Sequence, residues 1–518
     1  MNVPAFDQQD LVPLIPALTL SLGACVLMLS EVFLNSPKRA YQAWIALAAC
    51  TVGGFLAFFN AFEPARAVFQ GFAVLDPFSS LVTAIVCLGG ALAVLLSSGF
   101  LRHRNAERGE YYALVLFACA GMSLLALSSE LITLFVNLEV MSIATYALTA
   151  YLRRGSRPSE AGFKYFILGA FAAAVMLYGA ALLYGATGTT KLMEMEAPLR
   201  AALSTQPALV MLGFLLVGVG FAFKVAAVPF HMWTPDVYEG APTPVTALMS
   251  AGVKAAAFAA LVRVFMFVGK AVDPQTPFVF FAGLAALTMV VGNLLAMPQR
   301  NVKRMLAYSS VAHAGYLLVG VATLFSPSTQ NASMAVLKVS GLVAQAPVTT
   351  AEVLKGLLIY LLGYTVTSLG AFGVLSAIER REDEAHQHTW DLERLAGLAQ
   401  RRPGWAVAMA AFMMSLAGVP LTVGFIGKLY IFRAAVDGGL LGLVIVGVLS
   451  SAAGAYYYLR VVVYMFMRTS PEGAQLPERH TSTDFALIAC AVGVLVLGML
   501  PGTVSGWLTH AGMLFGAQ

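Results

Sequence analysis

The sequence predicts an all-α polytopic membrane protein with about 14 transmembrane helices. Hydrophobic residues make up 59% of its 518 residues and charged residues only 11%, whereas a soluble domain carries roughly 25% charged residues. Apolar segments of about 20 residues, the length that crosses about 30 Å of hydrocarbon, recur along the whole chain. Because no long basic run is present, the net charge of +5 does not indicate a nucleic-acid partner.

The predicted spans follow one another through mostly short connections. Their approximate limits are residues 11–33, 41–62, 76–100, 111–129, 131–151, 160–185, 207–230, 242–268, 277–297, 303–324, 353–378, 404–435, 439–467 and 483–511. The weakest division is the very short turn at residues 128–130. The first span follows Asp7 and Asp10 rather than a basic segment, so we expect no cleaved signal peptide.

Lysine and arginine residues predict the orientation of these spans. Eighteen lie in loops after odd-numbered spans, whereas only five lie after even-numbered spans: Arg66, Lys191, Arg200, Lys270 and Lys338. Because cytoplasmic loops carry the excess of positive charge, the odd-numbered loops are expected in the cytoplasm. Both termini are then predicted to be periplasmic, in the inner (plasma) membrane of a bacterium.

Five ionisable residues lie inside segments that otherwise read as membrane-spanning helix. They are Glu139, Lys224, Lys254, His313 and Lys428. A charge in hydrocarbon costs at least about 3 kcal/mol, so such residues need a partner or a hydrated cavity. Five of them on as many helices predict a path for protons or other ions.

Two spans carry helix-breaking residues close to a lysine. In the seventh span, Pro229 follows Lys224 by five residues. Because proline has no N–H, it is expected to leave the carbonyl of Val225 without its helical hydrogen bond. In the twelfth, Pro420 is expected to free the carbonyl of Leu416 near Lys428. Irregular backbone at membrane depth persists only where it is buried in protein or lines a hydrated cavity, so both breaks indicate a transport site.

The two breaks lie five spans apart, which predicts an inverted repeat. Because five is odd, the second unit enters the membrane from the opposite side, as in many secondary transporters. We therefore divide the chain into residues 1–110 (three N-terminal spans), 111–270 (spans 4–8), 271–470 (spans 9–13) and 471–518 (the last span). Broken helices 7 and 12 take equivalent places in the two repeats.

Plainer interpretations stay open for each candidate residue. Lys224 and Lys164 could extend their amino groups to the membrane surface. His313 alone could be an ordinary buried histidine, and the remaining three charges could form structural ion pairs. The aromatic residues Phe230, Trp233 and Tyr238 are expected to form a belt at the membrane interface.

The five cysteines lie in apolar stretches with no CxxC pair, so neither disulfides nor a metal cluster are expected. No nucleotide-binding fingerprint or haem ligand pair is evident in the sequence either. The chain is therefore expected to bind no cofactor and to perform no redox chemistry itself.

Several motifs resemble one known family. They are PFHMWTPDVYEGAPTPVTALMSAGVK (Pro229 to Lys254), LFVNLEVMSIATYAL around Glu139, EAGFKYFILGA around Lys164, NVKRMLAYSSVAHAGY around His313, and GFIGKLYIF around Lys428. They resemble the antiporter-like, proton-conducting membrane subunits of respiratory complex I. Multi-subunit cation/proton antiporters and membrane-bound hydrogenases belong to the same family. The resemblance covers roughly the third to the thirteenth span.

This resemblance implies fourteen core helices, two inverted five-helix repeats and specific residue roles. Glu139 and Lys224 would form a modulating pair, Lys254 and His313 a central relay, and Lys428 the exit group; Lys164 is a further candidate. The lysine at 428 and the ending after span fourteen resemble the smallest such subunit of bacterial NADH:quinone oxidoreductase, the subunit N type.

The resemblance also implies partners. These would be other complex I membrane subunits, including larger antiporter-like relatives, while FMN, Fe–S clusters and quinone would belong to partner subunits. Three alternatives remain: a subunit of a Na⁺/proton antiporter, a subunit of a membrane-bound hydrogenase, and a purely structural membrane subunit.

Overall fold

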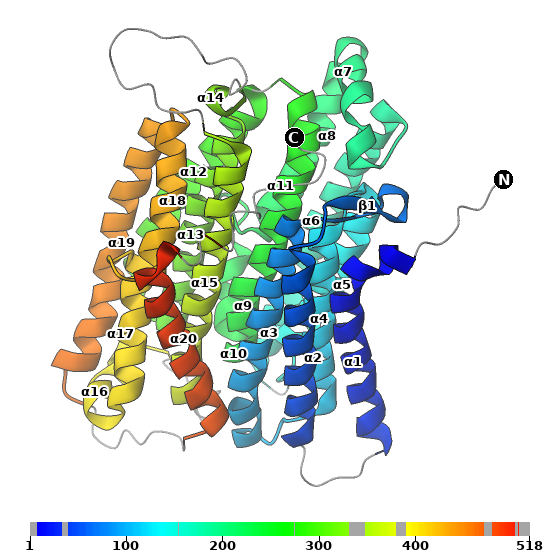
Figure 1. Cartoon of the computed structure of the whole chain (residues 1–518). Helices are drawn as coiled ribbons and strands as arrows, with labels where there is room; N and C mark the ends of the chain where they lie inside the picture. Colours follow the sequence, from blue (N-terminus) through cyan, green and yellow to red (C-terminus); the bar gives the residue numbers. More distant parts are fainter. Residues whose placement is uncertain are drawn as a thin grey trace.

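A computed structural model describes residues 8–33, 40–153, 155–273, 275–330, 348–379, 390–470, 479–502 and 506. In it, long helices run up and down in a single bundle (Figure 1). Thirteen helices in the described ranges are long and apolar enough to cross a membrane. Two shorter helices in series make a further crossing at the predicted twelfth span, so the all-α polytopic fold with fourteen spans is confirmed.

The first three spans precede the spans that carry the five candidate ionisable residues. They are α1 (Ile15–Phe33), α2 (Ala40–Asn60) and α3 (Pro77–His103), with η1 (Gln8–Leu14) before them. Between α2 and α3, β1 (Arg66–Val68) and β2 (Ala73–Leu75) form a small antiparallel hairpin around η2 (Phe69–Gly71). Asp76 caps the N-terminus of α3, because its carboxylate accepts the Ser79 N–H at 2.8 Å.

Spans four to eight contain the first broken helix. They comprise α4 (Gly109–Leu127), α5 (Leu131–Thr149), α6 (Ser156–Thr187), α8 (Pro207–Lys224) with α9 (Trp233–Gly240), and α10 (Thr243–Leu248), η4 (Met249–Val253) and α11 (Lys254–Ala271) in series; η3 (Leu192–Glu194) and α7 (Glu196–Thr205) connect α6 to α8. The predicted short turn at residues 128–130 is confirmed, since it separates α4 from α5. Glu130 caps α5 by accepting the Thr133 N–H at 2.6 Å.

Spans nine to fourteen contain the second broken helix. They comprise α12 (Gln275–Ala296), α13 (Val302–Leu324), α15 (Thr350–Ile378), α17 (Pro403–Ala417) with α18 (Val423–Asp437), α19 (Leu441–Met467) and α20 (Thr481–Met499); α14 (Pro327–Gln330), η6 (Leu392–Leu395) and α16 (Leu398–Arg401) are short connecting helices. Residues 503–505 and 507–511 of the last predicted span lie outside the described residues.

The two five-span units share one pattern of neighbours. In the first, α4 packs on α5, α5 on α6, α6 on α8, and α11 returns to α4; in the second, α12 packs on α13, α13 on α15, α15 on α17 and α18, and α19 returns to α12. Gly121 of α4 and Gly292 of α12 lie where the first helix of each unit packs closely against the second. A Cβ there would lie 2.6 Å from Met141 N and 2.7 Å from Ala312 N, respectively. The exact division at residues 110, 270 and 470 stays a prediction.

The units are inverted with respect to the two faces of the bundle. We call the face that carries Arg102, Arg153 and Arg300 the basic side. The first unit begins on this side with α4, whereas the second begins on the opposite side with α12 (Figure 1). Both ends of the described chain, η1 and the end of α20, lie away from the basic side.

Burial separates an inner group of helices from an outer one. The span formed by α10, η4 and α11 is wholly buried, and α13 and α15 are nearly so, whereas only about a third of α1, α2, α6, α19 and α20 is buried. The outer helices expose large apolar side chains such as Trp44, Phe171 and Met467. An apolar surface of this kind suits lipid rather than water, whereas the lysines within the spans, Lys224, Lys254 and Lys428, are buried in the protein interior.

Candidate functional site

The seventh span breaks directly after Lys224, the last residue of α8. The chain becomes helical again only at Trp233, whose indole N–H donates to the Phe223 carbonyl at 3.1 Å. The break therefore lies where we predicted one. Because α8 already ends at Lys224, the break begins several residues before Pro229, and the role of Pro229 in it stays a prediction.

Helix α5 holds the ammonium group of Lys224, whose side chain is buried. Lys224 Nζ donates to Ser142 Oγ at 2.7 Å and to the Tyr146 hydroxyl at 3.3 Å. Glu139 lies on the same face of α5, since residues i, i+3 and i+7 of a helix project to one side. It is half-buried, and its Oε1 atom has no hydrogen-bond partner.

Glu139 and Lys224 interact electrostatically. Within the part of the chain that the structure describes, however, no ion pair of 4.0 Å or less joins them. The structure therefore shows the two members of the expected pair on facing helices, with hydroxyl groups rather than the carboxylate holding the ammonium group.

Lys254 follows a local distortion of the eighth span. The five residues of η4 before it form a π-helical turn, a distortion found frequently at functional sites. The buried Lys254 Nζ donates to Ser310 Oγ at 2.6 Å and also to the Ser310 carbonyl. It lies 5.3 Å from the centre of the Tyr364 ring, so Lys254 of the first unit is held by α13 and α15 of the second.

His313 lies on α13 among tyrosine hydroxyl groups. Its Nδ1 atom is 2.6 Å from the Tyr360 hydroxyl, and its Nε2 atom is 3.2 Å from the Tyr458 hydroxyl. The Tyr458 hydroxyl in turn hydrogen-bonds Ser309 Oγ. Since a hydroxyl can donate or accept, each ring nitrogen can lose or gain a proton without losing its hydrogen bond.

Lys428 lies on α18, the second half of the second broken helix. Its Nζ donates to the carbonyls of Leu416 and Ala417, both at 3.0 Å, and to Ser451 Oγ at 2.7 Å. The Tyr316 ring centre is 4.9 Å away. The prediction that the break leaves the Leu416 carbonyl as an acceptor beside this lysine is confirmed.

One stripe of α13 connects these groups. Ser310, His313 and Tyr316 are spaced by three residues, so they lie along one face of the helix. Ser310 accepts from Lys254, and the Tyr316 ring lies against Lys428. A cavity of about 10 Å³ between His313 and the break after α17 has about the space of one water molecule.

Aromatic residues connect Lys224 with this stripe, and the sequence analysis did not select them for that role. The Tyr146 and Tyr165 rings are 4.7 Å apart, and Tyr165 stacks on Trp233 at 4.7 Å. Tyr238 interacts with the Ser310 side chain. Trp233 and Tyr238 are buried, so the prediction that they belong to a membrane-interface belt was wrong.

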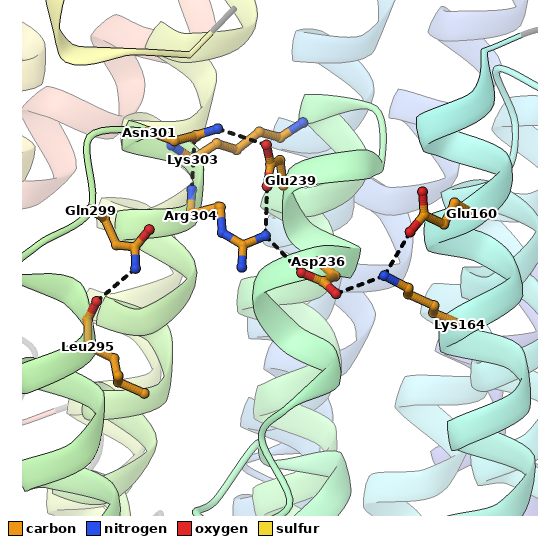
Figure 2. A network of polar contacts seen from close by, with 9 residues as sticks. All are labelled: Glu160, Lys164, Asp236, Glu239, Leu295, Gln299, Asn301, Lys303 and Arg304. Carbon is orange, nitrogen blue, oxygen red and sulfur yellow. Dashed lines mark hydrogen bonds and ion pairs between the residues drawn. The ribbon is translucent and has the colours of Figure 1, made fainter. Parts of the chain in front are cut away.

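Lys164 belongs to a network of charged side chains near the start of α13 (Figure 2). Its side chain is 41% exposed, and its Nζ pairs with Glu160 at 2.7 Å and with Asp236 at 2.9 Å. Arg304 of α13 pairs with the other oxygen of Asp236 at 2.7 Å and with Glu239 at 2.8 Å. This charged network ties α6 and α9 of the first unit to the start of α13 in the second.

The contacts of this network favour the ionised form of Asp236. Burial alone would raise its pKa, but hydrogen bonds from Lys164 and Arg304, together with their charges, bring the pKa of Asp236 below its ordinary value of 3.8.

A further buried pair was missed by the sequence analysis. Arg263 of α11 donates to Asp76 Oδ2 at 2.7 Å, and both side chains are fully buried. The Nε and Nη1 atoms of Arg263 have no hydrogen-bond partner. Arg263 lies inside the predicted eighth span, so the rule that selected the other buried charges could have found it.

Comparison with known proteins decides the family. Residues 128–340 and 336–454, together more than half of the chain, match the family described as "NADH:quinone oxidoreductase/Mrp antiporter, TM". NADH-quinone oxidoreductase subunit N of Myxococcus xanthus is 63% identical over the full length of both chains. The chain belongs to the subunit N family of NADH-quinone oxidoreductases. Subunit N of Trichlorobacter lovleyi is 41% identical, over 96% of each chain.

Solved structures agree with membership of the subunit N family. A chain of respiratory complex I from Thermus thermophilus with bound aureothin matches with a TM-score of 0.75 and 35% identity, over 95% of this chain and 98% of that chain. A chain of the Mrp complex from Dietzia sp. matches with a TM-score of 0.77 over 98% and 97%, at 24% identity. The second match shows a shared fold.

Proposed function

We propose that the chain translocates protons as a membrane subunit of a bacterial respiratory NADH:quinone oxidoreductase. Redox chemistry in partner subunits, which would hold FMN, Fe–S clusters and quinone, supplies the energy. The basic side faces the cytoplasm of the inner membrane, and both termini are periplasmic. Full-length relatedness to subunit N chains and the buried lysines beside two helix breaks support this proposal.

The observation that carries the proposal is the arrangement of Glu139 and Lys224. The ammonium group rests on neutral hydroxyls while a carboxylate with a free oxygen lies on the same face of α5. Bringing these charges to 4 Å would contribute about 4 kcal/mol at an effective dielectric constant near 20. Moving one charge against 100 mV costs about 2.3 kcal/mol. The energy gained or lost when this contact forms or breaks is therefore large enough to load and release a proton.

The released proton has a route of alternating amines and hydroxyls. From Lys224 it passes to the Tyr146 hydroxyl and then by way of the hydroxyls of Tyr165 and Tyr238 toward Lys254 and Ser310, since a hydroxyl can both accept and donate a proton. His313 continues the route, since its two nitrogens already contact hydroxyl groups, and Lys428 at the second break is the exit group. Five ionisable residues thus perform one function across both repeats.

The test is Glu139→Gln in the complete complex, reconstituted in vesicles. We expect proton uptake per NADH oxidised to fall while the complex assembles normally, because glutamine cannot supply the charge that controls Lys224. Glu110→Gln, at an exposed carboxylate on α4, serves as the matched control and should pump normally. Normal pumping by the Glu139 variant would favour the purely structural alternative.

The same vesicles test the antiporter alternative. A subunit with no redox partner would exchange Na⁺ for protons without NADH, whereas the proposed function requires NADH and persists in sodium-free medium. Purification with redox subunits, as opposed to small membrane subunits alone, gives an independent test.

A further inference from the structure

Lys303 is a fully buried lysine that the path described above does not use. It lies in the first turn of α13, on the basic side, and its side chain has no exposed surface. Its Nζ donates to the Ala241 carbonyl at 2.6 Å and lies 4.5 Å from the centre of the Trp390 ring. Among the described residues, no carboxylate lies within 4.0 Å of this ammonium group.

A merely structural role explains such a lysine poorly. A buried charge is unfavourable unless a counter-charge and several hydrogen bonds compensate it, and here one carbonyl and one ring face are the near partners. The charges that act on Lys303 from further away are of both signs: Glu379, Glu239, Arg104 and Arg157. An amine in this setting is suited to exchanging its proton.

Lys303 is aligned with the proposed path. It precedes Ser310 by seven residues, so both lie on one face of α13, about 10 Å apart along the axis at 1.5 Å per residue. Ser310 is the residue that accepts from Lys254. Polar groups of Tyr238 lie nearby: its hydroxyl interacts with Ser310, and its carbonyl accepts the Thr246 hydroxyl at 2.9 Å.

Near Lys303, a charged cleft opens on the basic side, although Lys303 itself does not line it. It has a volume of about 180 Å³, enough for several water molecules, and is lined by Arg157, Glu160, Lys164, Asp236, Glu239 and Arg304. Glu239 accepts from Asn301, the residue that begins α13 next to Lys303. Figure 2 shows the Lys303 side chain extending past Glu239 along the top of this network. Arg157 Nη1 is buried there without a hydrogen-bond partner.

We propose that Lys303 takes protons from this cleft and delivers them toward Lys254, as a second uptake route besides Lys224. The inference rests on the proposed function of proton translocation. One proton moves in each step: an N–H bond of Lys303 breaks, and an N–H bond of Lys254 forms by way of the intervening hydroxyls. The cleft then returns a proton to the neutral Lys303 amine, so no other reactant is needed.

The test compares Lys303→Arg, Lys303→His and Lys303→Gln in the assembled complex, with proton uptake per NADH as the readout. Lys254→Gln defines the share of pumping that depends on this chain. We expect Lys303→Gln and Lys303→Arg to lower that share at least twofold. Arginine keeps the charge and the stacking on Trp390, but a guanidinium is not deprotonated in proteins.

Histidine separates a proton carrier from a structural cation. We expect Lys303→His to pump more than Lys303→Gln, with a dependence on pH, because imidazole exchanges its proton near neutral pH. Wild-type pumping by Lys303→Arg would overturn the inference. If the arginine variant does not assemble, equal pumping by the histidine and glutamine variants would overturn it instead.

The design keeps this inference distinct from the proposed function. If Lys254→Gln pumps normally, the proposed function itself fails. If Lys254→Gln loses pumping while all three Lys303 variants retain it, only the second uptake route fails.

Discussion

Removing the charge of Asp76 should be among the most destabilising single changes in this chain. Its carboxylate lies 2.7 Å from Arg263 Nη2, and both side chains are fully buried. At an effective dielectric constant of about 20, two charges at this distance attract by about 6 kcal/mol. Breaking such a buried pair typically costs 3–5 kcal/mol, since one charge stays buried without its partner. We expect a loss of about that size for Asp76→Asn.

Asparagine isolates the charge because it retains the other role of Asp76. Its side-chain oxygen can still accept the Ser79 N–H and begin α3, as asparagine caps helices about as well as aspartate. The measurement is heat stability of the purified complex, followed as loss of this chain from the assembly. Asp273→Asn, at an exposed position, is the control and should behave like wild type.

A double variant completes the test. Adding Arg263→Met to Asp76→Asn removes the buried charge that the single variant leaves without its partner, so the double variant should recover part of the lost heat stability. The reasoning is refuted if Asp76→Asn is as stable as wild type. It is equally refuted if the double variant is no more stable than the single one.

Two further changes test packing and charge. Gly292→Ala should destabilise the complex by about 1–3 kcal/mol through overpacking, because its Cβ would lie 2.7 Å from the Ala312 backbone nitrogen; Gly283→Ala on the same helix meets open space and should be tolerated in the same heat assay. Asp236→Asn should lower stability at pH 7, where the lowered pKa of Asp236 stabilises the fold. That difference should shrink as the pH falls through 4 and below, and a difference independent of pH would contradict the assignment.

Much of the fold could be predicted because a membrane span can be recognised in a sequence by its length and its apolar residues. The short turn between α4 and α5 was correctly placed, since Glu130 is a capping residue at the boundary of two apolar runs. The Leu416 carbonyl was also correctly predicted as an acceptor beside Lys428, at a helix end that the left-handed Gly418 marks locally in the sequence. Local rules suffice where the cause is local.

The rest depends on contacts between distant segments. The pattern of apolar residues does not show that Tyr360 and Tyr458 meet His313, since they come from α15 and α19. The exposed network around Lys164 likewise needs α9 and α13. Arg263 is different, because its position in an apolar span made it visible in the sequence.

The hydroxyl groups around His313 can order their hydrogens in either of two directions. A hydroxyl has one hydrogen, so a string of hydroxyls and imidazole nitrogens points one way at a time. When a proton has passed along Ser309, Tyr458, His313 and Tyr360, every hydrogen in the string has moved to the opposite side of its atom. The string must turn back before it can carry another proton the same way. In the proposed route, this turning is therefore a step of its own in each cycle, separate from the proton hops.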